Sequence, residues 1–257
     1  RFEILGERIQ VKVDAEKMKG EDALLYMPDL DYDLVYQIVE NGYPIINIRG
    51  EAVVEPVPEG VWDGSTAESF AGGNGAITAP YLIENGAQLR LMLEKYSTLE
   101  ASSGVFFKLT KDIYLNNVLD GTSITKVRNK KNWLAGYGTV FPKVNSDNRA
   151  NTFNGSLDGD GHVIYGMYIS GANSAGLFPG ISGRAEIKNL GMENLYIAGG
   201  SYGGAFAGQA YYSSKAEGSA KISYCYVKDA VIGQGGSLES AAGFIGATND
   251  ATVTFKD

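Results

Sequence analysis

Apolar and polar residues alternate along several stretches of this chain with the period of two that indicates β-strands. Residues 8–13 show this alternation, and residues 34–39 are apolar and β-branched. Asn41-Gly42 marks a turn between that run and residues 43–48, which predicts a hairpin. These elements predict a small β-rich module over residues 1–58. It would be immunoglobulin-like but partial or unusually small, since a complete sandwich takes ~100 residues.

A different pattern follows. Residues 80–83, 105–109 and 113–115 have the composition of further short strands. A single amphipathic segment interrupts them, and we expect a helix over residues 86–99 that caps the open end of stacked β-structure. Its apolar residues follow the spacing of one helical face and are Leu89, Met92, Leu93 and Tyr96.

The second half of the chain repeats itself. Residues 185–197 align with residues 220–232, and Ile187 meets Ile222. Units of this length cannot bury a core alone, so they must stack. We therefore expect an all-β fold, a right-handed parallel β-helix (solenoid), over residues 59–257. The alternative is a β-sandwich in which the similarity is accidental.

Gly-rich apolar segments precede the repeated strands and extend the alignment. They are GLFPG, GAFAG and AGFIG, and the positions they equate are Phe178, Phe206 and Phe244, with Gly180, Gly208 and Gly246. The chain has 34 glycines in 257 residues, which fits short strands separated by tight turns.

Composition and charge exclude several classes of function. The net charge is −8, nearly all of it from the first 60 residues, which argues against nucleic-acid binding. With one cysteine (Cys225) and one histidine (His162), the sequence excludes an intrachain disulfide, a cysteine-based zinc site and a two-histidine metal site. No apolar run approaches the ~20 residues of a membrane span. Because the chain starts at Arg1, we expect a mature product or an expressed fragment.

Three segments resemble bacterial cell-surface proteins with GLUG-type repeats. They run from WDGS at Trp62 to YLI at Tyr81, through FFKLTKDIYL from Phe106, and through FNGSLDGDGHVI from Phe153. With the Gly-rich repeats they cover roughly residues 60–257. The resemblance implies a right-handed β-helix in large, secreted or wall-attached proteins, and the family also occurs beside catalytic modules, including immunoglobulin A proteases. This sequence departs from the family in lacking an anchor motif or a catalytic module.

Tyrosines are abundant in the repeats and are candidate ligand-binding residues. Exposed rings stack on sugar faces, and aligned positions on successive coils would form a flat aromatic strip. The alternative is that some rings point inward, since strands favour Tyr anyway. The candidates are Tyr165, Tyr168, Tyr196, Tyr211, Tyr212, Tyr224 and Tyr226.

One basic run gives a second candidate surface. It lies in a loop-like stretch and could hold an anionic glycan or wall polymer, or could be a solvated loop. Its residues are Lys126, Arg128, Lys130 and Lys131, with Trp133 beside them.

The turn around His162 also carries carboxylates. Asp158 and Asp160 could form half of a glycosidase site, and Asp160 with His162 an acid/base pair. We favour a structural role, in which the imidazole closes the turn by hydrogen bonds to the backbone while Gly159 and Gly161 supply unusual dihedrals.

A D-x-D-x-D pattern near the N-terminus makes a weak calcium candidate of Asp29, Asp31 and Asp33. The later Gly and Glu of an EF-hand loop are missing. Alternating acids on the wet face of an edge strand explain the pattern equally well.

The sequence therefore predicts a non-catalytic, secreted or cell-surface bacterial protein that acts in adhesion or carbohydrate binding. Its expected partners are an extracellular glycan or a host or matrix protein, and other modules of a larger polypeptide. No cofactor is expected apart from calcium at the three aspartates. The alternatives are a polysaccharide-degrading β-helix enzyme (a lyase or glycoside hydrolase) and a structural spacer.

Overall fold

The computed structural model describes residues 58–135, 152–198, 201–211, 218–234, 240–249 and 251–256, with four short strands before them. The chain divides into two compact units, Arg1–Pro56 and Val57–Asp257. In the first, β1 (Phe2–Leu5) pairs antiparallel with β2 (Arg8–Val11), and β3 (Tyr36–Gln37) pairs antiparallel with β4 (Ile45–Ile46). The second pair is the predicted hairpin. The calcium candidates lie outside the described residues.

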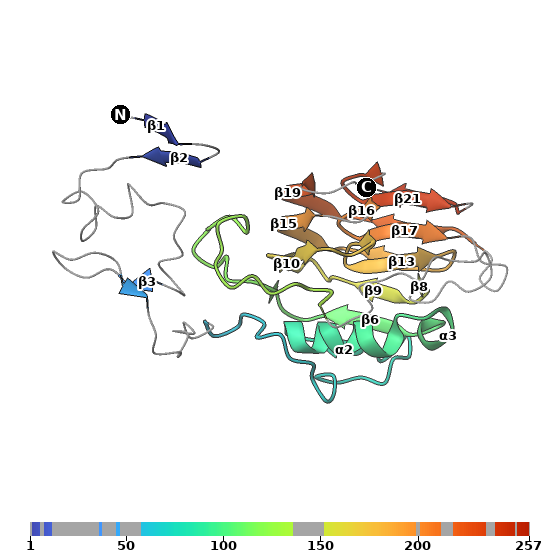
Figure 1. The fold of residues 1–257 in the computed structure, drawn as a ribbon. Coiled ribbons are helices and arrows are strands. Elements are labelled where there is room, and N and C mark those ends of the chain that lie inside the picture. The colour runs from blue at the N-terminus through green and yellow to red at the C-terminus, as the bar shows by residue number, and fades with distance from the viewer. Residues whose placement is uncertain are drawn as a thin grey trace. The chain divides into compact units, whose positions relative to one another are not determined.

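The second unit is a parallel β-helix, which confirms the predicted fold class (Figure 1). Successive coils place their strands in three long sheets, and the strands within each sheet run parallel. The first sheet contains β5 (Tyr81–Ile83), β6 (Phe106–Leu109), β9 (Ser156–Asp158), β14 (Glu186–Lys188), β18 (Ala220–Ser223) and β22 (Val253–Lys256).

The second sheet contains β7 (Ile113–Tyr114), β10 (Val163–Tyr165), β11 (Tyr168–Ser170), β15 (Gly191–Ala198) and β19 (Tyr226–Gln234). The third contains β8 (Thr152–Phe153), β13 (Phe178–Ser182), β17 (Ala207–Tyr211) and β21 (Ile245–Asn249). A short fourth sheet joins β12 (Ser174–Ala175), β16 (Tyr202–Gly203) and β20 (Ser240–Ala241).

The register agrees with most of the sequence alignment. Ile187 faces Ile222, as predicted. The alignment of Phe178 with Phe206 is wrong by one residue, since Phe178 pairs with Ala207. The coil that contains Ala207 has one more residue between the fourth sheet and the third than the coil before it. Ser174 and Phe178 are four positions apart, whereas their partners Tyr202 and Ala207 are five positions apart.

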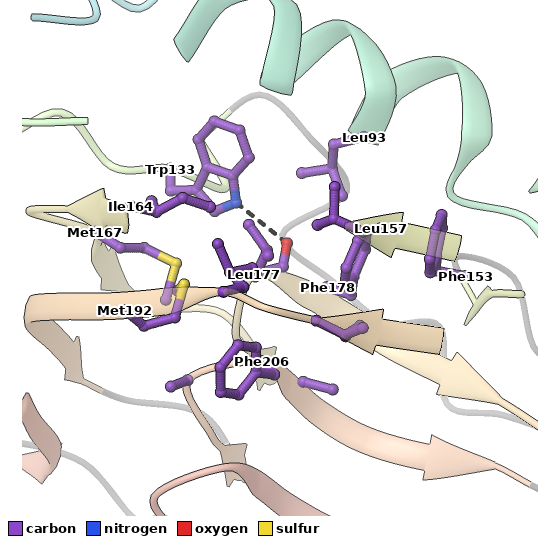
Figure 2. Close-up of a cluster of buried hydrophobic side chains, with 14 of the residues drawn as sticks. Leu93, Trp133, Phe153, Leu157, Ile164, Met167, Leu177, Phe178, Met192 and Phe206 are labelled. Atoms are coloured by element: carbon purple, nitrogen blue, oxygen red, sulfur yellow. Dashed lines mark hydrogen bonds between the residues drawn. The ribbon is translucent and has the colours of Figure 1, made fainter. Parts of the chain in front are cut away.

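Apolar side chains from successive coils fill the interior (Figure 2). The Phe178 ring stacks on Phe153 of the preceding coil, with centroids 4.2 Å apart. Leu157, Ile187 and Met192 are each fully buried. Burying one such side chain contributes about 1.5–3 kcal/mol, so the stack of coils supplies the core that a single coil lacks.

A helix closes the N-terminal end of the solenoid, as predicted. In α2 (Gly86–Tyr96), the Asn85 side chain caps the first turn by accepting from the Gln88 N–H. The helix ends at Tyr96 and not at residue 99, because Thr98 caps a second helix, α3 (Leu99–Ser102), by accepting from the Ala101 N–H. None of the described helices has the length and apolarity needed to cross a membrane.

Candidate functional site

Residues from four successive coils form a polar aromatic row on the outside of the second sheet. Tyr114 lies beside Tyr165 in register, followed by Glu193 and then Lys228. Their inward neighbours Ile113, Ile164 and Met192 are buried, and side chains alternate across a strand, so the row faces outward. We call this surface the tyrosine face, and define it as Tyr114, Tyr165, Glu193, Tyr226 and Lys228.

The first two rings of the tyrosine face stack on each other. The centroids of Tyr114 and Tyr165 are 4.7 Å apart and their planes differ by 8°. Each ring therefore covers one face of the other. Burial raises the pKa of Tyr165, and the nearby charges of Glu193 and Asp112 raise it further.

Tyr226 lies differently, with its ring across the neighbouring strand. A Cβ built on Gly191 would meet Cζ, Cε1 and the hydroxyl of Tyr226 at 2.6, 2.7 and 2.7 Å. Cζ is bonded to both Cε1 and the hydroxyl oxygen, yet it lies no farther from that Cβ position than either of them. The Cβ would therefore approach the face of the ring and not its edge. Tyr226 is 44 % exposed, so the opposite ring face is open to solvent.

Glu193 holds the Tyr226 ring in this position. The Tyr226 hydroxyl donates to Glu193 Oε1 at 2.6 Å, and Lys228 Nζ lies 3.2 Å from Oε2. The hydrogen bond to the carboxylate, together with burial, raises the pKa of Tyr226 to about 12. The side chain therefore stays a neutral phenol at physiological pH.

His162 and Asp112 border the tyrosine face. His162 Nδ1 lies 3.1 Å from Asp112 Oδ1, which also accepts from the Val163 N–H at 3.0 Å. The imidazole therefore contacts a carboxylate, whereas the sequence predicted hydrogen bonds from the imidazole to the backbone. The turn is closed instead by the His162 N–H, which donates to the Gly159 carbonyl at 2.8 Å.

The glycines of this turn have two different roles. Gly161 has the expected positive φ of 85°, and Asp160 has a φ of 52°. Gly159 is needed for space, since a Cβ there would lie 2.3 Å from the Asn189 carbonyl oxygen.

The carboxylates of the turn hold neighbouring coils together. Asp160 pairs with Lys108 at 2.9 Å and Asp158 with Lys188 at 3.4 Å. Burial pushes the pKa of Asp158 up, but hydrogen bonds from Asn189 and the Asp160 N–H, with the Lys188 charge, hold that pKa below its ordinary value. Asp160 and His162 therefore contact different partners, Lys108 and Asp112, and do not form a pair. Across the described parts of the chain, no three His, Cys, Asp or Glu side chains gather where they could hold a metal ion.

The predicted basic run and a second tyrosine pair come together. Tyr168 and Tyr196 stack with centroids 5.4 Å apart and planes 9° apart. Lys130 Nζ lies 5.3 Å from the Tyr168 centroid and 5.8 Å from that of Tyr196. Lys126 and Arg128 are exposed.

Asparagines fix this loop on the solenoid. The Asn116 amide donates to the Lys131 carbonyl, and its oxygen accepts from the Lys131 N–H. Asn194 donates to the Thr122 carbonyl and accepts from the Ile124 N–H. The loop is therefore attached to the β-helix at several points and is not merely solvated.

Two candidate ligand-binding residues are buried instead. Trp133 is fully buried, and its indole N–H donates to the Leu177 carbonyl at 3.2 Å (Figure 2). Tyr211 is 2 % exposed, and its hydroxyl bonds to Gln209. Neither ring is open at the surface: Trp133 fills the core, where a large ring gains more than by facing water, and Tyr211 is covered although it is not part of the hydrophobic core.

The other two tyrosines have separate outcomes. Tyr224 is exposed, but it follows the first sheet, where Lys256 Nζ lies 5.8 Å from its ring. Tyr212 lies outside the described residues.

Sequence reasoning missed Tyr114, Asp112, Glu193 and Lys228. One signal could have found the first of them: the dipeptide Ile-Tyr recurs at residues 113–114 and 164–165. A long insertion separates the two copies, so the repeat alignment did not reach them.

Comparison with known proteins gives limited similarity. No family model matches the chain. Halomucin from Haloquadratum walsbyi is 31 % identical over 148 residues, which cover 57 % of this chain and 2 % of halomucin. A solved structure of a proposed immunoglobulin A1 protease from Bacteroides ovatus aligns with a TM-score of 0.45 and 22 % identity, covering 72 % of this chain and 48 % of that one. The chain thus spans a small part of one of these proteins and about half of the other.

Proposed function

We propose that this chain is a non-catalytic carbohydrate-binding module of an extracellular or cell-surface protein with GLUG-type repeats, and that the tyrosine face binds the glycan. The observation that carries the proposal is the orientation of Tyr226, whose ring lies over Gly191 with its other face open. The similarity to halomucin is compatible with an extracellular role.

The chemistry of the tyrosine face suits a saccharide. One face of a pyranose ring is lined by C–H groups, which pack on an aromatic ring, while its hydroxyls need polar partners at the edge. Glu193 offers acceptor oxygens beside the Tyr226 ring, and Lys228 offers a donor. The hydroxyls of Tyr114 and Tyr165 extend the polar edge along the solenoid.

The test is binding of the whole chain to a glycan array, followed by calorimetry on the best ligand. Tyr226→Ala is expected to weaken binding about tenfold, since an aromatic contact contributes ~0.5–1.5 kcal/mol beyond the area it buries. Tyr226→Phe keeps the ring and is expected to retain most of the affinity.

The matched control is Tyr224→Asn, which removes an exposed tyrosine from a different surface. Tyr224 has a φ of 54°, a conformation that Asn tolerates, so the control variant should fold and bind as the parent does. Unchanged binding by a folded Tyr226→Ala variant would contradict the assignment of the tyrosine face. An array with no bound glycan would favour the spacer alternative.

A further inference from the structure

An outward row of the second sheet runs from the Tyr226 ring to the carboxylate of Asp112. Tyr226 pairs in register with Gly191, and Gly191 pairs with Val163. The Val163 N–H donates to Asp112 Oδ1 at 3.0 Å, which places Asp112 beside Val163 where β7 begins. Neighbouring strands lie about 4.8 Å apart, so two steps, ~10 Å, separate the backbone of Gly191 from that of Asp112.

Val163 lies in this row between the aromatic ring and the carboxylate. Its side chain has the outward direction of Tyr165, because side chains alternate across a strand and the intervening Ile164 is buried. Only 8 % of Val163 is exposed, so neighbouring side chains cover it. A saccharide that packs on Tyr226 and extends across β10 toward β7 therefore follows a closed surface.

Asp112 has a carboxylate oxygen to offer to a ligand. The contacts from His162 Nδ1 and from a backbone N–H both end on Oδ1. Among the residues that the structure describes, Oδ2 has no hydrogen-bond or ion-pair partner, and the side chain is 43 % exposed. Glu193 differs, because the Tyr226 hydroxyl and Lys228 occupy its two oxygens. Asp112 can therefore accept a hydrogen bond from a bound cation.

The electrostatics of the tyrosine face favour a cation at its Asp112 end. After burial, the charges of Glu193 and Asp112 raise the pKa of Tyr165, so the negative charge of Asp112 reaches that ring. Lys228 lies at the other end, since three strand spacings, about 14 Å, separate β19 from β7. Its Nζ is also paired with Glu193. An ammonium group is therefore stabilised beside Asp112, and an anionic group is repelled there.

We propose that the tyrosine face takes an amino sugar, a saccharide whose ring carries an ammonium group in place of a hydroxyl, and that Asp112 binds this ammonium. The inference rests on the proposed carbohydrate-binding function and names its substrate class. One sugar ring packs on Tyr226, and the ammonium of that sugar or of the next one donates to Asp112 Oδ2 in a charge-assisted hydrogen bond. An N-acetylated sugar lacks this charge and binds through the ring contact alone.

The experiment is calorimetry of the whole chain with two probes that differ only in acetylation. They are a fully deacetylated chito-oligosaccharide and the fully acetylated chito-oligosaccharide of the same length, in a mildly acidic buffer that keeps the amines protonated. We expect the deacetylated probe to bind about fivefold more tightly, the upper range for an exposed ion pair. Asp112→Asn should remove this preference, since Asn keeps an oxygen for the Val163 N–H and loses the charge.

Asp229→Asn is the matched control, because it removes the same charge from an exposed position next to Lys228. Asp229 has a φ of 52°, which Asn tolerates. The control should keep the preference for the deacetylated probe. His162→Gln removes the imidazole that contacts Asp112, and the preference should persist in that variant also. Circular dichroism should show every variant folded.

The inference and the proposed function can fail separately. Equal losses in Asp112→Asn and Asp229→Asn would overturn the inference, because attraction would then be to overall charge. Equal binding of the two probes, or no binding of the deacetylated probe, would overturn it too and leave carbohydrate binding in place for any other glycan. The proposed function fails instead if a folded Tyr226→Ala variant binds each glycan as the parent does.

Discussion

Replacing Trp133 with Ala tests whether the loop after β7 belongs to the core. The side chain is fully buried and meets Trp62 edge-on, with ring centroids 5.2 Å apart. Replacing a buried Trp with Ala costs about 3–5 kcal/mol. The Leu177 carbonyl would also lose its donor, a loss of roughly 1 kcal/mol. We therefore expect the free energy of unfolding of the variant to be about 4–6 kcal/mol lower than that of the parent.

Urea-induced unfolding followed by Trp62 fluorescence is the assay. Trp62 is the other tryptophan of the chain and packs against the same site, so its emission reports on this end of the solenoid. Trp133→Phe separates the two contributions: it keeps a ring but removes the indole N–H, and should lose about 1–2 kcal/mol. An exposed control, Tyr224→Asn, should change the free energy by less than about 0.5 kcal/mol.

A loss below about 1 kcal/mol in Trp133→Ala would refute this reasoning, because only surface positions tolerate such a deletion. The hypothesis that Trp133 contacts a ligand would then be restored. A loss in the expected range, with the Lys130 region still folded, would leave as candidate ligand contacts only the basic residues of this loop and the rings of Tyr168 and Tyr196 beside Lys130.

Two further predictions concern the tyrosine face and the turn beside it. In Gly191→Ala the new methyl occupies the place of the Tyr226 ring and should displace it. The pKa of Tyr226, measured by carbon-13 NMR of labelled tyrosine, should then fall from about 12 toward 10.0. An unchanged pKa would place the ring elsewhere. The pKa of Asp158 is lower in the folded protein than the unfolded value of 3.8. The Asp158 carboxylate therefore stabilises the fold above pH 3.8, and this stabilisation is lost as the pH falls through the lower, folded-state pKa. Asp158→Asn should therefore lose less stability than the parent between pH 4 and pH 2 in acid titrations of the free energy of unfolding, and parallel curves would contradict the role of Asp158.

Sequence reasoning reached the architecture because the repeat and the physics agree. A unit with one apolar row per strand must stack, and the match of Ile187 with Ile222 followed from the alignment alone. Phe178 was misaligned because an extra residue before Ala207 shifts the register by one. Such an insertion leaves the apolar pattern intact on either side, so the pattern cannot locate it.

The candidate site was harder to predict because tyrosine suits both sides of a strand. Tyr211 is buried and Tyr165 faces outward, yet both stand in β-strands of the repeats. Glu193 was missed because a lone carboxylate on a strand has no distinctive neighbours in sequence. Its partner Lys228 lies one coil away and becomes adjacent only when the coils stack.

The stacking of coils also explains why one tyrosine differs from the rest. Identical residues at matching positions on adjacent coils stack face to face, as Tyr114 and Tyr165 do, and thereby cover the surfaces that a sugar would use. A ring can lie flat on the sheet only where the adjacent coil has no side chain. Tyr226 meets this condition because Gly191 is its partner in register. The feature that creates a sugar platform on a β-helix is therefore a tyrosine paired with a glycine, and a continuous row of tyrosines would bury its own ring faces.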